Sequence, residues 1–560
     1  MDTIYLNGTG TNSDQKATGN FLASANKTIN INSTVSGSTS DNSEVVINKA
    51  GSDGSTYTGK VSVNGDAKIE NTTISLYDGQ LAFAHDRNLD ASNKLNLYGG
   101  TLNLLNNEFG SYQLRAQELN LKGDTNIMLD VDLKNQKMDS ILKDNFGSIT
   151  NGDVDNKYTL NVSQMKSVTE AQGDSARILF TDAPELIGHV TNKGAGIVEA
   201  PINKYKVTQE TINNPVSGGG DAPDNGEYFV FDKIGNSDSI IAGPVAAQAA
   251  FLIQDNLYRQ SFANMDFVTL MTPEQRMAWK MRNKYANAGY HTGVYAPNVI
   301  PEERDGFYVR PFTNFENVPL KGGPRVSNVS YGTLIGGESD IVELGHGWDG
   351  NFSFFGAYHG SHQAYNGVSI WQNGGTFGGV ATAYKGNFWT GVTANVGASA
   401  AESHHAFGND QFPILMTGAA WKSGYNWGLF NNKFIIQPSY MMSYTFVNVF
   451  DYTNAAGVKV TQDPLNAIEI IPGLRLIGNL KNGWQPYLGV NMTWNIMDKT
   501  KFYANEVPLA QLSVKPYIEY GVGLQKRYGD RFTGFGQAML RNGGRNGIAL
   551  TMGFRWALGN

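Results

Sequence analysis

The last fourteen residues, GIALTMGFRWALGN, sort their side chains by both size and polarity. Alternate positions hold Ile548, Leu550, Met552, Phe554, Trp556 and Leu558, and the positions between them hold Ala549, Thr551, Gly553, Arg555 and Ala557. A period of two places these two sets on opposite faces of a β-strand. The C-terminus therefore predicts a strand with one large apolar face and one small or charged face.

The same sorting recurs in segments 436–446, 484–496 and 514–524. From Gly306 onward about twelve such strands can be placed, an even number that permits antiparallel closure. A soluble sandwich of two sheets is the competing interpretation, but the strands are longer than usual and Tyr and Trp gather near their ends. We therefore predict a transmembrane barrel whose large face contacts lipid. Its watery lumen is expected to receive five charged residues: Glu469, Arg475, Lys515, Glu519 and Arg555.

Composition excludes several other classes of protein. No run of about 18 apolar residues is present, so a membrane-spanning helix is not predicted. A formal charge of −7 and no strongly basic stretch argue against a nucleic-acid partner. The absence of cysteine excludes disulfides and thiolate metal sites. The N-terminal residues show no secretory signal, so we expect an exported form to be synthesised with a segment that precedes them.

The first 200 residues carry an internal repeat. The stretches ISLYDGQLAF (74–83) and LNLYGGTLNL (95–104) share one skeleton, and LNLKGDTNIML (119–129) is a weaker third copy. A period in the twenties is typical of a solenoid, whose rungs bury apolar residues against neighbouring rungs. We predict a short right-handed parallel β-helix over residues 1–200, with a plain β-meander as the alternative.

Two segments connect these parts. Residues 201–243, which include GGG at 218–220, are expected to form a flexible connection or an irregular cap. Residues 244–304 are expected to be helical, with a first helix of about 20 residues from Pro244 and a second helix from Thr272. Gln248, Asp255, Asn256 and Arg259 make the first helix too polar for lipid. The fold class is thus all-β, with a linker helix in the lumen of a barrel spanning 305–560.

Several motifs resemble those of the autotransporters, the type V secretion proteins of Gram-negative outer membranes. They are GFYVRPF (306–312), the terminal GFRW, and the stretch IIQPSYMMSYTFVNVFDYTNAAGVKVTQD (435–463). SYQLRAQELNLKGDTNIMLDVDL (111–133) is similar to the final rungs of the β-helical passengers that this family exports, as in pertactin-like members. The resemblance is strong in the barrel and loose before about residue 110.

The resemblance implies an outer-membrane barrel that supports translocation and surface display of its passenger. The implied partners are outer-membrane lipid, the barrel-assembly machinery and periplasmic chaperones. This chain departs from the family in ending ALGN after Trp556, so Phe554, Trp556 and Leu558 are expected to serve together as the assembly signal. The Asn-Asn pair at which family passengers are cleaved is also missing, and Asp255-Asn256 is the nearest match.

No catalytic, cofactor or metal site is expected. The Gly173–Ser175 tripeptide, GDS, lacks the rest of a lipase block and is interpreted as a turn. His359 and His362 would point to opposite faces of a strand, and His404 and His405 are placed in a loop. Asp130 and Asp132 share a face, which alone is weak evidence for calcium or glycosidic chemistry.

The sequence therefore leaves three hypotheses for the whole protein. The first is surface display of an adhesin-like module with an unknown surface ligand. The second is display of a β-helical polysaccharide hydrolase. The third is a plain outer-membrane channel with a periplasmic appendage.

Overall fold

The computed structural model describes residues 3–9, 15–106, 114–213, 224–263, 265, 306–339, 341–430, 432–480, 483–528 and 532–558. The chain divides into two compact units, Met1–Ser237 and Asp238–Asn560. Both are built mainly of β-strands, and one long helix begins the second unit. The helix predicted from Thr272 lies outside the described residues.

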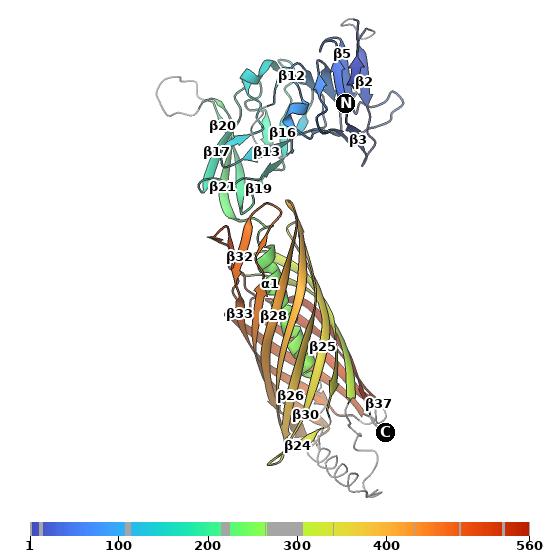
Figure 1. Ribbon diagram of the computed structural model, residues 1–560, viewed down its shortest axis with the longest axis vertical. Coiled ribbons are helices and arrows are strands. Elements are labelled where there is room, and N and C mark those ends of the chain that lie inside the picture. Colours follow the sequence, from blue (N-terminus) through green and yellow to red (C-terminus); the bar gives the residue numbers. More distant parts are fainter. Residues whose placement is uncertain are drawn as a thin grey trace. The chain divides into compact units, whose positions relative to one another are not determined.

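Three sheets of parallel strands make up most of the first unit (Figure 1). The first contains β1 (Thr3–Leu6), β4 (Thr34–Gly37) and β7 (Ile69–Glu70). The second contains β2 (Ala17–Phe21), β5 (Ser43–Ile47), β8 (Thr73–Leu76), β10 (Lys94–Leu97), β12 (Ala116–Leu121) and β15 (Phe146–Asn151). The third contains β3 (Thr28–Ile31), β6 (Lys60–Val63), β9 (Gln80–Phe83), β11 (Thr101–Asn103), β13 (Thr125–Asp132), β16 (Leu160–Ser167) and β18 (Val190–Asn192), with β14 (Lys137–Met138) antiparallel to β13.

The repeated sequence skeleton aligns residue for residue across these sheets. Leu95 pairs in register with Ile74 on one side and with Leu119 on the other, and all three side chains are fully buried. Tyr77 and Tyr98, which follow the strands, stack with their ring centroids 4.4 Å apart. Each buried aliphatic side chain contributes about 1.5–3 kcal/mol to stability. Equivalent positions of successive copies therefore form continuous apolar columns.

An antiparallel sheet ends the first unit, in the order β17 (Ser175–Thr181), β21 (Gly226–Asn236), β20 (Asn203–Ile212), β19 (Ile197–Glu199). Much of residues 201–243 thus belongs to paired strands, where the sequence predicts a flexible connection or an irregular cap. Tyr205 and Val207 alternate with polar residues on β20, whereas Phe229 and Phe231 lie on either side of Val230 on β21, and all four are buried in the core.

A closed antiparallel barrel of twelve strands forms the second unit, as predicted. Its strands are β22 (Gly306–Pro319), β23 (Arg325–Glu338), β25 (Trp348–Tyr365), β26 (Val368–Lys385), β27 (Phe388–His405), β28 (Gly408–Tyr425), β30 (Phe434–Val449), β33 (Leu465–Gly478), β34 (Trp484–Ile496), β37 (Tyr517–Tyr528), β38 (Phe532–Gly543) and β39 (Asn546–Ala557). Pairing of β22 with β39 and of β23 with β25 closes the circuit. Closure leaves no long edge with unpaired backbone groups.

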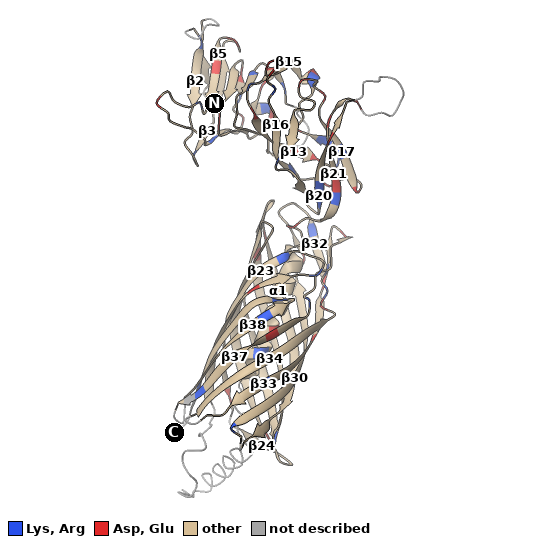
Figure 2. Cartoon of the chain, turned by 180° about the vertical axis from the view of Figure 1, so that it is seen from behind, with Lys and Arg blue, Asp and Glu red and all other residues tan. Residues whose placement is uncertain are grey.

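The two faces of the barrel strands differ as the sequence pattern predicts. Met552, Phe554 and Trp556 point outward and are about half exposed, whereas Thr551 and Ala549 are buried in the interior. Leu488, Val490 and Met492 on β34 are likewise exposed on the outer face. Most of the barrel carries neither acidic nor basic residues in Figure 2. One prediction is wrong: Val514 precedes β37 and is buried, so it is not part of the outer face.

The barrel has two unlike ends. Connections 450–464 and 497–516 carry a small sheet in the order β31 (Tyr452–Thr453), β32 (Lys459–Asp463), β35 (Lys501–Ala504), β36 (Val507–Pro508). We call this end the long-loop rim; it also holds the turns after β22, β25, β27 and β38. The opposite rim contains the start of β22 and the end of β39, together with β24 (Val342–Gly345) and β29 (Trp427–Leu429).

Helix α1 (Ala242–Ser261) lies inside the barrel (Figure 1). Asp238, just before the helix, accepts a hydrogen bond from Tyr365 at the long-loop rim, with 2.9 Å between the oxygens. All residues of α1 except Arg259 are buried. Small residues at 246, 247, 249 and 250, all alanine, keep it thin enough for the lumen. In the described part of the chain, no helix combines the length and the apolar character needed to cross a membrane.

Candidate functional site

The helix and the barrel meet in a closed ring of six charged side chains, which we call the charge ring. It contains, in order, Asp255, Arg259, Glu519, Arg541, Glu316 and Arg545. Neighbouring nitrogen and oxygen atoms lie 2.7–3.2 Å apart around the whole ring. Acids and bases alternate, so each charge lies between two of opposite sign and the ring is neutral.

The ring joins segments that are far apart in sequence. Asp255 and Arg259 are one helical turn apart on α1, so both project from the same face of the helix. Glu316, Glu519 and Arg541 take inward-facing positions on β22, β37 and β38, and Arg545 lies in the turn that follows β38. The Arg545 side chain is fully buried and forms two hydrogen bonds to Glu316, of 2.7 and 2.8 Å. Such a bidentate pair fixes orientation as well as charge.

Further polar contacts hold α1 along its length. Gln248 donates to the backbone oxygens of Asp498 and Leu512 at 2.6 and 2.9 Å, beneath the long-loop rim. Tyr258 donates to the backbone oxygen of Tyr444 at 2.9 Å. Asn256 accepts from Arg541 at 3.5 Å. The helix positions singled out in the sequence, from Pro244 to Arg259, therefore all lie within the lumen.

A glycine on β28 makes room for the helix. A Cβ atom added to Gly418 would overlap the Tyr258 hydroxyl and the backbone oxygen of Tyr444. We expect Gly418→Ala to destabilise the barrel by about 1–3 kcal/mol, the usual cost of overpacking. Denaturant unfolding of the detergent-solubilised protein measures this loss. Gly356→Ala is the matched control, since nothing lies near its added Cβ.

A second substitution separates overpacking from a general glycine effect. Tyr258→Phe removes the hydroxyl that the new methyl group would overlap. The Gly418→Ala/Tyr258→Phe protein should therefore lose less stability than the sum of the two single changes. Simple additivity of the two losses would show that the helix does not approach β28 at this point.

The predicted lumen residues take different roles. Glu519 belongs to the charge ring, and Arg555 pairs with Glu338 on β23. Glu469 is buried and accepts a hydrogen bond from Ser443 at 3.4 Å. Arg475 lies over the Tyr487 ring, 5.3 Å from its centroid. Lys515 does not face the lumen: it precedes β37 and its side chain is exposed, because the strand begins three residues later than the alternating segment 514–524.

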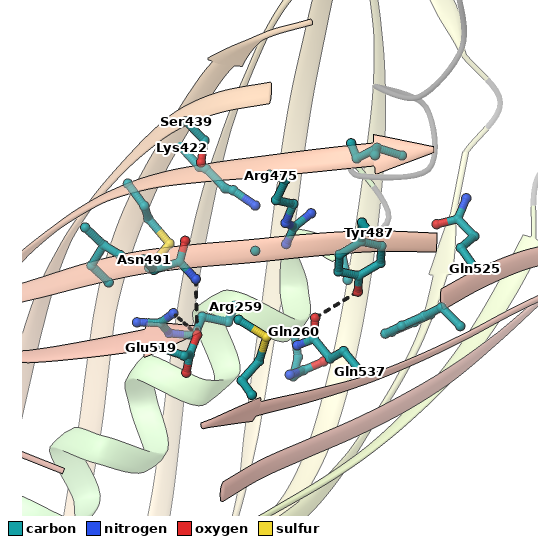
Figure 3. Close-up of a pocket in the computed structure, with 17 residues that line it drawn as sticks. Arg259, Gln260, Lys422, Ser439, Arg475, Tyr487, Asn491, Glu519, Gln525 and Gln537 are labelled. Carbon is teal, nitrogen blue, oxygen red and sulfur yellow. Dashed lines mark hydrogen bonds and ion pairs between the residues drawn. The ribbon is translucent and has the colours of Figure 1, made fainter. Parts of the chain in front are cut away.

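A polar cavity of about 80 Å³ lies beside the end of α1 (Figure 3). Figure 3 shows Arg259 and Glu519 on one side and Arg475, Tyr487 and Gln537 on the other. Tyr487 and Gln537 are joined by a hydrogen bond of 3.0 Å. The cavity has room for several water molecules beside the buried helix.

Sequence reasoning missed three members of the charge ring, namely Glu316, Arg541 and Arg545. The signal for the first two was present, because Glu316 alternates with Phe315 and Arg541 with Leu540 in the same large-and-small pattern. Arg545 is different. It sits in a turn, where side-chain direction does not follow a period, and only the fold brings it to Glu316.

The proposed assembly-signal residues, Phe554, Trp556 and Leu558, are all exposed on the outer face or just beyond it. Phe554 stacks on Phe532 of β38 with 5.8 Å between centroids, and Trp556 contacts the same ring edge-on. These residues form an aromatic patch at the opposite rim.

The histidine candidates end up as structural residues. His359 is buried and bonds Thr376 at 2.9 Å, while His362 stacks on Trp371. His404 and His405 end strand β27, so their placement in a loop is wrong. The strand continues to the turn because it pairs in full with β28. The His405 side chain is buried and bonds Asp410 at 2.9 Å.

The remaining polar candidates lie in the first unit. Ser175 of the GDS tripeptide follows a bend and donates to Asp232 at 2.8 Å. Asp130 accepts from the backbone nitrogen of Asn106 at 2.7 Å. Asp132 accepts from Asn135 and from the Thr169 hydroxyl, the latter at 2.9 Å. Their carboxylates thus hold backbone and neighbouring side chains in place.

Asp132 gives a stability prediction for this unit. Burial raises the pKa of Asp132, but hydrogen bonds from Asn135 and Thr169 outweigh burial and leave that pKa below its usual value. We expect Asp132→Ala to cost about 1–3 kcal/mol, since several donors lose their acceptor. The contribution of Asp132 should be complete above its unfolded pKa, about 3.9, and be lost as pH falls through the lower folded pKa.

Hydrogen exchange of the β13 amides in the full-length protein measures the effect. Asp66→Asn is the control, because Asp66 makes an exposed ion pair with Arg87 and such pairs contribute about 0–1 kcal/mol. Equal protection of β13 in both variants would contradict the structural role of Asp132.

Comparison with known proteins gives structural matches only. No family model matches the sequence, and no curated protein matches it. The beta domain of the Bordetella autotransporter BrkA is similar, with 16% identity over 46% of this chain and 100% of that chain and a TM-score of 0.39. The transport unit of the autotransporter AIDA-I from Escherichia coli has 15% identity, covers 51% and 99%, and has a TM-score of 0.41. The translocator domain of the autotransporter NalP from Neisseria meningitidis has 10% identity, covers 57% and 100%, and has a TM-score of 0.41.

Proposed function

We propose that this chain is an outer-membrane autotransporter, in which the barrel supports translocation and surface display of the N-terminal unit. One observation carries the proposal: α1 is buried inside a closed barrel and continues directly into the first unit at its N-terminal end. A chain that passes through the lumen in this way connects the two sides of the membrane that the barrel spans.

The outer face supports a lipid environment. Large apolar side chains cover it, including Phe354, Phe377 and Val522, each more than half exposed. Soluble monomers rarely expose apolar patches of such extent. Outward apolar residues with an inward polar set are instead the pattern of a membrane barrel.

The two rims support an orientation. Outer-membrane barrels carry short turns on the periplasmic side and longer loops outside. The long-loop rim, with its connections 450–464 and 497–516, is therefore proposed to face the cell exterior. Since α1 begins at this rim, the residues before it would be displayed on the cell surface.

The first unit is proposed to be a right-handed parallel β-helix. The support is the in-register parallel pairing of successive copies, such as β8 with β10 and β10 with β12, while the intervening strands β9 and β11 pair in a second sheet. Stacking of such rungs outside the cell would bias transport forward without a nucleotide. Each rung that forms would bury its apolar side chains against the rung before it.

We propose that this unit binds a surface ligand and that it is not an enzyme. The support is that its paired carboxylates, Asp130 and Asp132, are occupied by structural hydrogen bonds. The proposed partners of the barrel in biogenesis are the barrel-assembly machinery and periplasmic chaperones. Phe554, Trp556 and Leu558 are proposed as the assembly signal. The helix buried in the lumen favours display over an open channel with a periplasmic appendage.

Protease treatment of intact cells tests the proposed display. We expect release of about the first 200 residues, together with a barrel that stays in the outer membrane and migrates differently on gels before and after heating. Cells with a permeabilised outer membrane provide the control for total accessibility. Protection of the N-terminal unit in intact cells, with cleavage only after permeabilisation, would place it in the periplasm and refute display.

A further inference from the structure

A groove of about 1110 Å³ lies at the long-loop rim, outside the charge ring and the lumen. It is formed by the turn after β22, the end of β34 and the connection 497–516. Among the described residues that line it, four are lysines and one is an acid. The lysines are Lys321, Lys499, Lys501 and Lys515, and all four are exposed.

The backbone around the groove is held in a defined position. Lys321 and Ser513 exchange two backbone hydrogen bonds, of 2.9 and 3.2 Å, which join the turn after β22 to the long connection. Thr500 donates to the backbone oxygen of Leu512 at 3.0 Å, and Leu512 is fully buried. Gln248 of α1 bonds the same connection from below. The lysines thus extend from a scaffold that is already folded.

The acid in the groove offsets only one of the four positive charges. Asp498 is buried, and its carboxylate accepts a hydrogen bond from the backbone nitrogen of Val514 at 2.9 Å. Outside the lining, Asp463 lies opposite Lys501 in the strand register. The four lysines outnumber the two acids, Asp498 and Asp463, so the groove keeps a net positive charge.

The groove lies at the edge of the apolar outer face of the barrel. On β34 the outward residues Val490, Met492, Trp494 and Ile496 are exposed and apolar up to the rim. Ile496 and Met497 also line the groove, and Met497 is 59% exposed. The lysines therefore begin where the apolar face ends. This is the level at which lipid head groups meet acyl chains.

We propose that this groove binds the phosphorylated head group of an outer-leaflet glycolipid, lipopolysaccharide. The lysine ammonium groups pair with its phosphates, and Ile496 and Met497 contact the first part of an acyl chain. Lysine is a common phosphate ligand in proteins, and the groove is large enough for a sugar-phosphate head group. The inference rests on the proposed function, since it requires the long-loop rim to face the outer leaflet.

The test uses the full-length protein purified in detergent, with the diphosphorylated lipid anchor of lipopolysaccharide as the probe and native mass spectrometry as the readout. We expect Lys499→Gln/Lys501→Gln/Lys515→Gln to bind the probe about 100-fold more weakly, which corresponds to about 3 kcal/mol. Lys515→Gln alone should lose about fivefold, or about 1 kcal/mol. The same lipid without phosphates should bind the wild-type protein as weakly as it binds the triple variant.

The matched control changes three lysines at the opposite rim, Lys385→Gln/Lys433→Gln/Lys526→Gln. Equal loss in this control, equal binding of the phosphate-free lipid, or complete displacement by millimolar inorganic phosphate would overturn the proposal. Heating-dependent gel migration is measured for every variant. A wild-type barrel that inserts normally but does not bind the lipid refutes only this inference, whereas a wild-type protein absent from outer membranes refutes the proposed function.

Discussion

Replacing Arg545 with alanine should destabilise the barrel by about 3–5 kcal/mol, the usual cost of leaving a buried charge without its partner. Arg545 is fully buried and contacts both Glu316 and Asp255. Without it the charge ring holds three acids and two bases, and its acids Glu316 and Asp255 are buried. Denaturant unfolding of the detergent-solubilised protein, followed by tryptophan fluorescence, measures the change.

Two further variants show whether the loss arises from charge. Glu316→Gln/Arg545→Met removes one acid together with one base, so the remaining members of the ring are again balanced. We expect this protein to be more stable than the sum of the single losses implies, with a coupling of at least about 1 kcal/mol. Arg325→Ala, at the exposed start of β23, should change stability by no more than about 0.5 kcal/mol. A loss at Arg545 no larger than that at Arg325 would refute the ring as a stabilising contact between helix and barrel.

The second large effect is expected on the outer face. Val396 is 52% exposed near the middle of β27, where the proposed membrane is driest. Val396→Arg should cost about 2–4 kcal/mol, because a cation at the bilayer midplane loses its hydration. The measurement is the unfolding free energy of the barrel in lipid vesicles.

The same strand supplies the control. His404 lies on the same face as Val396 but at the long-loop rim, where its side chain is 45% exposed. His404→Arg should cost only about 0–1 kcal/mol, since charged residues near the interface reach water. If both arginines cost the same in vesicles, the outer face does not contact hydrocarbon and the barrel is not a membrane protein.

The sequence was sufficient to predict those parts of the fold in which one local pattern extends over many residues. Alternation from Gly306 onward gives the strands, their number and their faces, because every barrel strand separates the same two environments. The repeat at Ile74, Leu95 and Leu119 gives the stacking of strands, because each copy packs on the next. Helix α1 was predicted from its alanines and from Pro244, two residues away from its observed start.

The sequence was insufficient where contacts depend on distant segments. The barrel partners of Asp255 lie on β37 and in the turn after β38, and no local pattern links these positions to the helix. Lys515 and Val514 follow the alternation of β37 but precede the strand, since the long connection turns away toward Lys321. Strands β20 and β21 were missed because a glycine-rich interval separates them.

The pairing of β22 with β39 has a consequence for the timing of folding. The first barrel strand finds one neighbour only among residues 546–557, close to the C-terminus. The barrel cannot close until residues 546–557 have been made, and contacts of such long sequence separation form slowly. Closure of the barrel is therefore a late step that follows the synthesis of all twelve strands.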